Sequence, residues 1–276
     1  MTTVGTVVGT VVQINRFPVK SMQGESVESV AVDENGIVGD RTWALRDVET
    51  DKLVSAKRPR LWRAMLDCRA TGTGGDVIVD LPGSQALGIT DPALPEALRG
   101  LLGRAVAVEA AMTPGQGVYD SDWPEIDGVD LSGELELPTN LTGEGTSFID
   151  LGVLHLLTTA SLDTLADIGP DTAADARRFR PSIIIETPDF DGFAEDAWQG
   201  RAARIGEIEI VVGHPAPRCV MTTLQQGDLP AERGVLTTLA AHHRVSTSLG
   251  TFACLGAYAT VRHPGRLHLG DSVELC

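Results

Sequence analysis

The chain has 276 residues, of which 42% are hydrophobic, so it is long enough to build one large or two small hydrophobic cores. Its formal net charge is -16, which argues against nucleic acid or an anionic membrane as the main partner, because both require a cationic surface. No apolar run approaches the roughly 18 residues of a membrane helix, and the first residues lack the charged region and cleavage site of a signal peptide. We therefore expect a globular, cytoplasmic protein.

The first part of the chain is predicted to be mostly strand. Five segments are rich in β-branched or alternating apolar residues: 4–17, 27–47 (with an Asn35-Gly36 turn), 61–70, 76–81 and 104–110. One helix is predicted over residues 93–103, because Asp91-Pro92 supplies a start signal and Gly103 a stop signal.

The last part of the chain continues this pattern with two short helices. Residues 153–168 predict a strand that runs into a helix capped by Thr159 or Ser161. The remaining expected elements are a short helix at 171–179, a buried strand at 180–187, an alternating pair at 203–214 and a closing hairpin at 256–275. Many short strands with few short helices predict a mostly β (α+β) fold that contains a barrel.

Residues 112–147 interrupt the periodic pattern. This segment is rich in Pro, Gly, Asp and Glu and shows few apolar repeats, which is typical of a linker or a functional loop. It lies in a longer acidic stretch, since no Lys or Arg occurs between Arg104 and Arg177. We therefore predict a first domain at 1–111, an acidic linker or loop at 112–147 and a second domain at 148–276.

Cys219 is the candidate reactive residue. It follows Arg218 in a segment stiffened by Pro215 and Pro217, and a neighbouring guanidinium favours the thiolate, which attacks electrophiles or binds soft metals. Taken alone, a cysteine that follows a strand is more often a buried core residue than a reactive one. The other three, Cys68, Cys254 and Cys276, show no metal-binding spacing and are interpreted as structural, core and incidental. His155, in an apolar strand, is interpreted as a core residue.

Basic residues gather at predicted strand ends. Lys20 and Ser21 follow Pro18, Arg41 follows a bend at Gly39, and Arg178 and Arg180 precede a strand. Nineteen of the 22 basic residues are arginine, whose planar fork suits phosphate and carboxylate groups. Each position alone could be a solvated turn, but the repeated pattern favours a site for a small anion.

Several ordered motifs resemble one family. The segment "INRFPVKSMQG" with "GDRTWALRD" resembles the N-terminal β-barrel module of MOSC proteins. The segments "RRFRPSIII", "FAEDAW", "IGEIEI", "PRCVMTT", "LGAYATV" and "LHLGDSVEL" resemble, in this order, the MOSC domain itself, which is named after the C-terminal domain of molybdenum cofactor sulfurase. The likeness covers about residues 5–60 and 148–276, and it implies an N-terminal β-barrel-like module followed by a MOSC β-barrel.

The resemblance implies a protein of the molybdenum cofactor, similar to the mitochondrial amidoxime-reducing component and its bacterial relatives. It implies that Cys219 is the catalytic thiolate and the molybdenum ligand, with Arg218 beside it. The cofactor contacts that it implies are Lys20, Ser21, Arg41, Asp150, Arg180, Ser182 and Arg218. The chain departs from the family pattern at three places: Ser182 replaces Asn, Gly152 replaces a hydroxyl residue, and Leu255-Gly256 replaces Phe-Gly.

The implied activity is a two-electron reduction of small N-hydroxylated or N-oxide compounds. No cysteine spacing for an iron–sulfur cluster occurs in the sequence, so we expect electrons from a separate donor protein. Two alternatives stay open: a sulfur carrier in which Cys219 bears a persulfide, and a non-catalytic protein that binds or delivers the cofactor.

Overall fold

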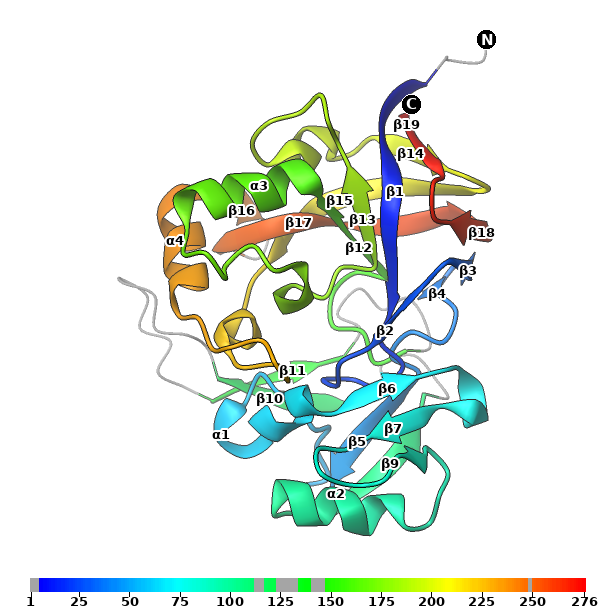
Figure 1. Ribbon diagram of the computed structural model, residues 1–276, viewed down its shortest axis with the longest axis vertical. Helices are drawn as coiled ribbons and strands as arrows, with labels where there is room; N and C mark the ends of the chain where they lie inside the picture. Colours follow the sequence, from blue (N-terminus) through cyan, green and yellow to red (C-terminus); the bar gives the residue numbers. More distant parts are fainter. Residues whose placement is uncertain (1–4, 112–116, 123–133, 140–146, 248–249) are drawn as a thin grey trace.

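The computed structural model describes residues 5–111, 117–122, 134–139, 147–247 and 250–276. Its centre is a closed barrel of seven strands in the order β12-β13-β1-β19-β14-β15-β17, with β17 pairing back to β12 (Figure 1). These strands are β1 (Thr6–Arg16), β12 (Leu154–Thr158), β13 (Ile183–Glu186), β14 (Ala202–Ile205), β15 (Ile208–Pro217), β17 (Gly250–His263) and β19 (Ser272–Leu275). The predicted mostly β fold with short helices is confirmed.

The first strand belongs to this barrel although it is far in sequence from the others. β1 pairs antiparallel with β13 on one side and with β19 on the other. Its inward residues Val8, Val11 and Ile14 are spaced by three rather than two, because irregularities in both pairings shift the register. They join Ile183, Ile185 and other aliphatic side chains in the main core.

A second, smaller unit lies below the barrel in Figure 1 and has a core of its own. It contains two sheets, β5 (Trp43–Asp47) with β9 (Val106–Ala110), and β6 (Arg69–Thr71) with β7 (Ile78–Asp80) and β8 (Leu87–Gly88). Helix α2 (Leu94–Leu102) buries Leu94 and Leu98 against them and ends at Gly103, as predicted. The linking elements are β2 (Glu25–Val27), which pairs with β1, and β3 (Ser29–Asp33) with β4 (Gly36–Ile37) and β18 (Gly265–His268).

The predicted strand at 61–70 is wrong over most of its length. Pro59 begins helix α1 (Pro59–Trp62), and a short 3-10 helix, η1 (Arg63–Asp67), follows it. Trp62, Met65 and Leu66 are buried at the i, i+3, i+4 spacing of one helix face, so the apolar pattern of this segment is that of a helix rather than a strand. Only the end of the segment enters a strand, β6.

Two further expectations for the last part of the chain need correction. Helix α3 (Thr159–Ile168) is capped by Thr158, whose hydroxyl accepts from Ser161 N, rather than by Thr159 or Ser161. The tail is not a closing hairpin, because β17 pairs with β12, β15 and β16 (Arg244–Thr247), β18 with β3, and β19 with β1 and β14. Residues 171–179 form only the 3-10 helix η3 (Ala176–Arg178), and α4 (Gly234–His242) covers β17.

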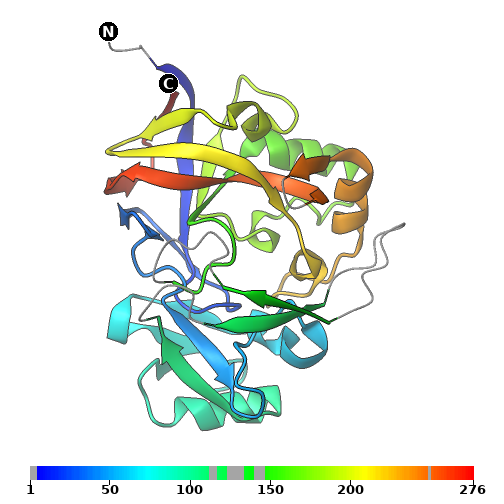
Figure 2. The ribbon, with the colours of Figure 1, turned by 180° about the vertical axis from the view of Figure 1, so that it is seen from behind.

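Two strands occur within 112–147 that the sequence analysis did not predict. β10 (Val118–Asp122) and β11 (Glu134–Pro138) pair antiparallel, and Figure 2 shows them between the barrel and the smaller unit. Tyr119 and Ser121 of β10 are buried, whereas the alternate residues are half-buried. The hairpin therefore forms part of the wall between the two units.

Candidate functional site

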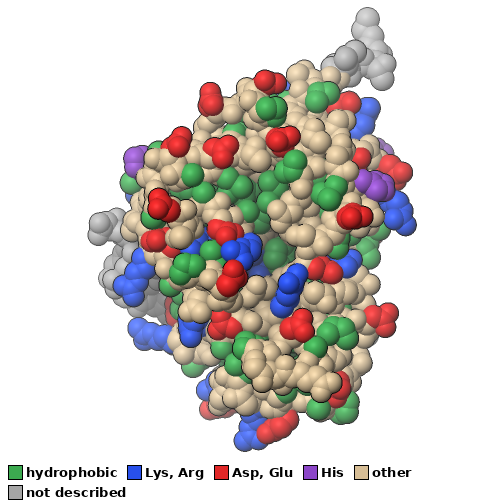
Figure 3. Space-filling view, in the orientation of Figure 1, with side chains coloured by type: hydrophobic (Ala, Val, Ile, Leu, Met, Phe, Trp, Pro, Cys, Tyr) green, Lys and Arg blue, Asp and Glu red, His purple; other side chains and the backbone are tan. Residues whose placement is uncertain are grey.

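A cavity of about 370 Å³ lies where the barrel, the smaller unit and the β10–β11 hairpin meet. All eight residues selected from the sequence line it: Lys20, Ser21, Arg41, Asp150, Arg180, Ser182, Arg218 and Cys219. The face in Figure 3 is hollowed at this level, and basic side chains gather around the hollow. Six cationic side chains line the space, Lys20, Arg41, Lys57, Arg178, Arg180 and Arg218, against one carboxylate among the described residues, Asp150. We call this space the cationic cavity.

Left-handed backbone is concentrated at this cavity. Among the described residues, four that are not glycine have positive φ, and three of them line the cavity: Ser21 at 67°, Arg41 at 48° and Arg180 at 55°. Each such residue costs about 1–2 kcal/mol. Strain of this kind persists where the surrounding structure holds it, and it is commonly found at ligand sites.

The two N-terminal motifs interlock around Phe17. Its N–H donates to Asp40 Oδ1 at 2.7 Å, and its carbonyl accepts from Arg41 N at 2.8 Å. The guanidinium groups of Arg41 and Arg180 lie over its ring, 4.7 and 4.2 Å from the centroid. Arg41 also pairs with Asp40, and Arg180 Nη1 donates to Met22 O at 2.6 Å. Two like charges are thus held close together on one aromatic ring.

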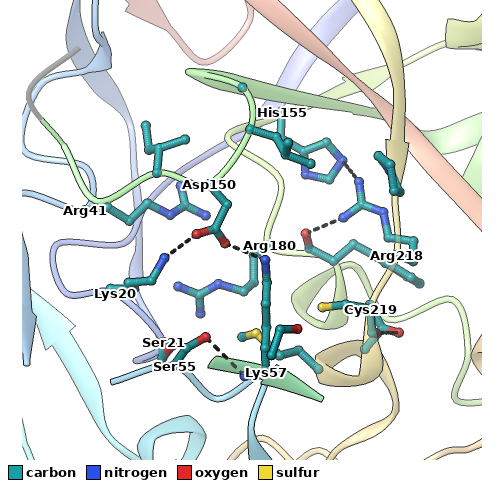
Figure 4. A pocket seen from close by; sticks show the side chains of 18 of the residues that line it. Lys20, Ser21, Arg41, Ser55, Lys57, Asp150, His155, Arg180, Arg218 and Cys219 are labelled. Atoms are coloured by element: carbon teal, nitrogen blue, oxygen red, sulfur yellow. Dashed lines mark hydrogen bonds and ion pairs between the residues drawn. The ribbon is translucent and has the colours of Figure 1, made fainter. Parts of the chain in front are cut away.

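Asp150 lies between two lysines, Lys20 and Lys57 (Figure 4). Lys20 Nζ pairs with Asp150 Oδ1 and donates to Phe148 O at 3.0 Å. Lys57 Nζ lies 2.8 Å from Asp150 Oδ2 and 2.9 Å from the Tyr119 hydroxyl. Burial tends to raise the pKa of Asp150, but the two ammonium groups outweigh it and hold that pKa well below its usual range. One carboxylate cannot fully compensate two cations, and burial lowers the pKa of Lys20 to about 8.

Arg218 is fixed by three hydrogen bonds. Its Nε donates to Ala216 O at 3.0 Å, Nη1 to Phe179 O at 3.2 Å, and Nη2 lies 2.7 Å from His155 Nε2. Because a guanidinium can only donate, this geometry assigns the unprotonated nitrogen of His155 to Nε2. Burial, and then the charge of Arg218, lower the pKa of His155 well below its usual value. The histidine is buried and hydrogen-bonded as predicted, and it also lines the cavity.

Cys219 lies where β15 leaves the barrel. The Arg218 N–H donates to Ala253 O at 2.9 Å, and Cys219 then precedes the 3-10 helix η5 (Val220–Thr223). The N–H and hydroxyl of Thr222 donate to Cys219 O, at 3.2 and 3.0 Å. The side chain is half-buried and packs beside Met221. Cys68 and Cys254 are buried, as expected of structural residues, and Cys276 is exposed.

Ser182 and Gly152 show how the chain accommodates two of its departures from the family pattern. Ser182 is buried, its hydroxyl accepts from His155 N at 3.1 Å, and its N–H donates to His155 O at 2.8 Å. A Cβ on Gly152 would lie 2.6 Å from Cβ and Cγ of Tyr258, so the tyrosine occupies the space of a side chain there. At both positions the space or the hydrogen bonds of the family's side chain are taken over by neighbouring residues, His155 at Ser182 and Tyr258 at Gly152.

Sequence reasoning missed several polar residues of the cavity, among them Lys57 and Tyr119. Lys57 belongs to none of the motifs singled out in the sequence, and Tyr119 lies in the segment expected to be a linker or loop. The burial alternation of Tyr119 and Ser121 is a strand signal, but it extends over too few residues to be distinctive.

The side chains of the cavity fit a negatively charged group that contains a metal able to bind a thiolate. Cationic side chains surround the space, and one accessible thiol lies at its edge. In the described part of the chain, no three His, Cys, Asp or Glu side chains converge as a metal site. None of the helices there is both long and apolar enough to cross a membrane.

Two family models match the chain. The MOSC N-terminal beta barrel domain matches residues 8–100, and the MOSC domain matches residues 146–274. A mitochondrial amidoxime-reducing component 1 from Mus musculus is 25% identical over 297 residues, covering 97% of this chain and 82% of the relative. The protein of the same name from Danio rerio is 33% identical over 130 residues, covering 46% of this chain and 38% of the relative.

Two further proteins show some likeness to this chain. A molybdenum cofactor sulfurase from Oryza sativa subsp. japonica is 26% identical over 258 residues, covering 83% of this chain but 30% of the relative. The crystal structure of the YuaD protein from Bacillus subtilis superposes with a TM-score of 0.45 at 9% identity, covering 97% of this chain and 94% of that one. The two family matches, which follow each other in the chain, confirm the resemblance seen in the motifs. This chain therefore belongs to the MOSC proteins, with a MOSC N-terminal β-barrel domain followed by a MOSC domain.

Proposed function

We propose that this chain binds a molybdenum cofactor in the cationic cavity and reduces small N-hydroxylated or N-oxide compounds, with the Cys219 thiolate on the metal. The observation that carries the proposal is the excess of cations around a thiol, in a chain whose net charge is -16. A pterin cofactor that bears a phosphate and a dithiolene is anionic and needs such an environment. The likeness to amidoxime-reducing components and to a molybdenum cofactor sulfurase supports the same cofactor.

Each proposed contact follows from a side chain already fixed in place. Arg41 and Arg180, stacked on Phe17, would neutralise anionic groups of the cofactor, together with Lys20 and Ser21. Arg218 is immobilised next to the thiol, so it can donate its remaining N–H groups without reorganisation. Asp150 and Ser182 complete the set, the first by orienting Lys20 and the second by its bond to His155.

The proposed reaction breaks an N–O bond and consumes two electrons and two protons. The oxygen leaves as water. With an N-hydroxylated compound one proton goes to the oxygen and one to the nitrogen of the product, whereas with an N-oxide both protons end in the water. The cofactor supplies the two-electron chemistry when bound, with electrons from a separate donor protein. The chain's own residues bind and orient the reactants and exclude bulk water. A small N-hydroxylated molecule as substrate, no nucleic acid or membrane as partner and a cytoplasmic location remain predictions.

The test is to express the chain in a host that makes the molybdenum cofactor. We expect near-stoichiometric molybdenum and pterin, and reduction of benzamidoxime with reduced viologen as the electron source. Cys219→Ala is expected to lower kcat by at least about 100-fold, because a metal ligand is removed. Cys276→Ala is the matched control, since Cys276 is exposed and does not line the cavity.

The outcomes separate the alternatives. A protein that carries molybdenum but reduces no N-hydroxy compound would be a cofactor-binding or delivery protein. A protein without molybdenum or pterin that bears a persulfide on Cys219 would be a sulfur carrier. If Cys219→Ala keeps full molybdenum and activity, the assignment of Cys219 is wrong.

A further inference from the structure

The β10–β11 hairpin contributes to the cavity although it lies between the two family matches. The matches cover residues 8–100 and 146–274, and the hairpin strands lie at Val118–Asp122 and Glu134–Pro138. Tyr119, Ser121 and Leu137 of this hairpin line the cationic cavity. Neither matched domain therefore accounts for this wall of the site.

Tyr119 is the point where this hairpin meets the charged groups. Its ring is fully buried, and the ammonium groups of Lys20 and Lys57 lie 4.6 and 4.9 Å from the ring centroid. Its hydroxyl accepts from Lys57 Nζ at 2.9 Å. Burial, and then the charge of Asp150, raise the pKa of the phenol, so it stays protonated and neutral.

The hairpin is fixed to the segment that carries Lys57. Leu53 N donates to Val118 O at 2.9 Å, and Asp122 N donates to Lys57 O at 2.8 Å. Asp120 lies 2.8 Å from Lys52 Nζ and 2.5 Å from Arg58 Nη1. Tyr119 is thus held in register with Lys57 by contacts on both sides of it.

Lys57 is directed by two of its three donors. An ammonium group has three N–H bonds, and here Asp150 and Tyr119 accept two of them. Among the described residues, no hydrogen bond takes the third, and Lys57 lines the same cavity as Cys219. Burial lowers the pKa of Lys57, but Asp150, then Tyr119 and Cys219 raise it, and the net value lies well above the usual one. The side chain is a cation with one donor left for a ligand beside the thiol.

We propose that Lys57 is a further contact for the anionic group bound beside Cys219, and that Tyr119 is the positioning residue that directs it. This inference rests on the proposed function and adds a third segment to the site. The ligand is an anion of the cofactor, since an ammonium group already paired with one carboxylate contributes most to binding when it meets a second negative charge.

The experiment compares four variants, each prepared in the host that makes the cofactor. Lys57→Met removes the cation and Lys57→Arg keeps it; Tyr119→Leu removes ring and hydroxyl, and Tyr119→Phe keeps the ring. Lys52→Met is the matched control, because Lys52 belongs to the same segment and pairs with the hairpin but does not line the cavity. Molybdenum and pterin content, the rate of cofactor loss after desalting, and kcat and KM for benzamidoxime are measured, with the unfolding midpoint of each variant.

We expect cofactor loss to be about tenfold faster or more in Lys57→Met and Tyr119→Leu, because a charge-assisted hydrogen bond is removed. Lys57→Arg is expected to lose cofactor at a rate close to wild type, because it keeps the cation. Tyr119→Phe is expected to lie between wild type and Tyr119→Leu, and Lys52→Met is expected to keep the wild-type rate. If Lys57→Met or Tyr119→Leu fails to fold, the rates of cofactor loss from Lys57→Arg and Tyr119→Phe still test the inference, since both variants keep the bulk of the side chain.

The failures are distinguishable. If wild-type protein is loaded and active, yet Lys57→Met and Tyr119→Leu retain cofactor and keep both kinetic constants, this inference is overturned and the proposed function stands. If the wild-type protein takes up no molybdenum or pterin, both are overturned. Equal losses in Lys52→Met would show a structural role of the hairpin and would also overturn the inference.

Discussion

Two glycines, Gly152 in the cavity wall and Gly256 behind His155, are required by the rings that pack against them. A Cβ on Gly152 would lie 2.6 Å from the Tyr258 side chain, and one on Gly256 would lie 2.3 Å from His155 Nε2. Gly256 also has a φ of 77°, which a residue with a side chain rarely adopts. Tyr258 lies beside both His155 and His214, with ring centroids 5.8 and 5.5 Å away. These glycines therefore set how closely β17 approaches the site.

Gly152→Ser tests this packing, because it restores the hydroxyl that the family pattern implies. We expect it to lower the free energy of unfolding by about 1–3 kcal/mol, since the new Cβ must displace Tyr258. Urea unfolding of the cofactor-free protein measures the change. Gly75→Ser is the control, because a Cβ there has no neighbour within 4 Å. If Gly152→Ser were as stable as wild type, Tyr258 would be free to move aside, and its packing would not be the reason for a glycine at position 152.

At the scale of elements, a partly buried ion pair joins the 3-10 helix η4 (Ala194–Trp198) to the end of α4. His243 Nε2 lies 2.7 Å from Asp196 Oδ2, and His243 Nδ1 lies 2.8 Å from Cys254 O. The imidazole stacks on Phe193 with a centroid distance of 3.6 Å. Burial lowers the pKa of His243, but Asp196 and the Cys254 carbonyl raise it more, so the net pKa lies above the usual value.

This pair predicts a pH dependence of stability. Because the folded pKa of His243 is raised, its contribution is complete below the unfolded pKa of about 6.5 and is lost as pH rises through the folded value. Asp196→Asn keeps the hydrogen bond without the charge, so we expect it to be less stable than wild type at pH 6, by on the order of 1 kcal/mol, and nearly equal at pH 9. Denaturant unfolding across this range measures the difference.

The control is the exposed pair of His263 and Glu209, whose nitrogen and oxygen are 4.0 Å apart with the imidazole 72% exposed. Glu209→Gln should leave the pH profile unchanged, since exposed pairs contribute little. A constant gap between Asp196→Asn and wild type from pH 6 to 9 would contradict the assignment to His243.

Local signals predicted those elements whose ends and periodicity lie in one segment. The helix that ends at Gly103 and the strand at 153–158 are examples, because start and stop residues flank a clear apolar pattern. The helix at Pro59 was missed, since apolar spacing over few residues fits a helix or a strand equally. The tail was misread because its partners, β3 and β1, lie more than 200 residues away in sequence. Pairing at such distance has no local signature.

The site residues also divide into those with a local sequence signal and those that depend on contacts distant in sequence. The eight residues selected from motifs meet at one cavity, because each motif ends an element at the junction of barrel and smaller unit. Lys57 and Tyr119 belong to no such motif, and only the folded hairpin brings them to Asp150. Their contribution depends on tertiary contacts that neither composition nor spacing records.

At the scale of the whole molecule, the two matched domains share one barrel. β1 belongs to the range matched by the N-terminal domain, yet it completes the barrel between β13 and β19, which belong to the MOSC match. Val8, Val11 and Ile14 would leave a gap in the main core if the strand were absent. Thr6 pairs with Leu275, so the two ends of the barrel sequence are adjacent, as Figure 1 shows.

This arrangement predicts that residues 146–276 do not fold alone, whereas a permuted chain does. In the permuted chain, residues 5–17 follow residue 276 through a short Gly/Ser linker, so that β19 and β1 form a hairpin. We expect cooperative thermal unfolding and dispersed amide signals from the permuted chain, and neither from 146–276 alone, because two edges of the barrel would be unpaired. A permuted chain with Val11→Asp and Ile14→Asp is the control, since charges at these buried positions should abolish the rescue. Cooperative unfolding of 146–276 by itself would show that the barrel closes without β1, and the two domains would then be separable.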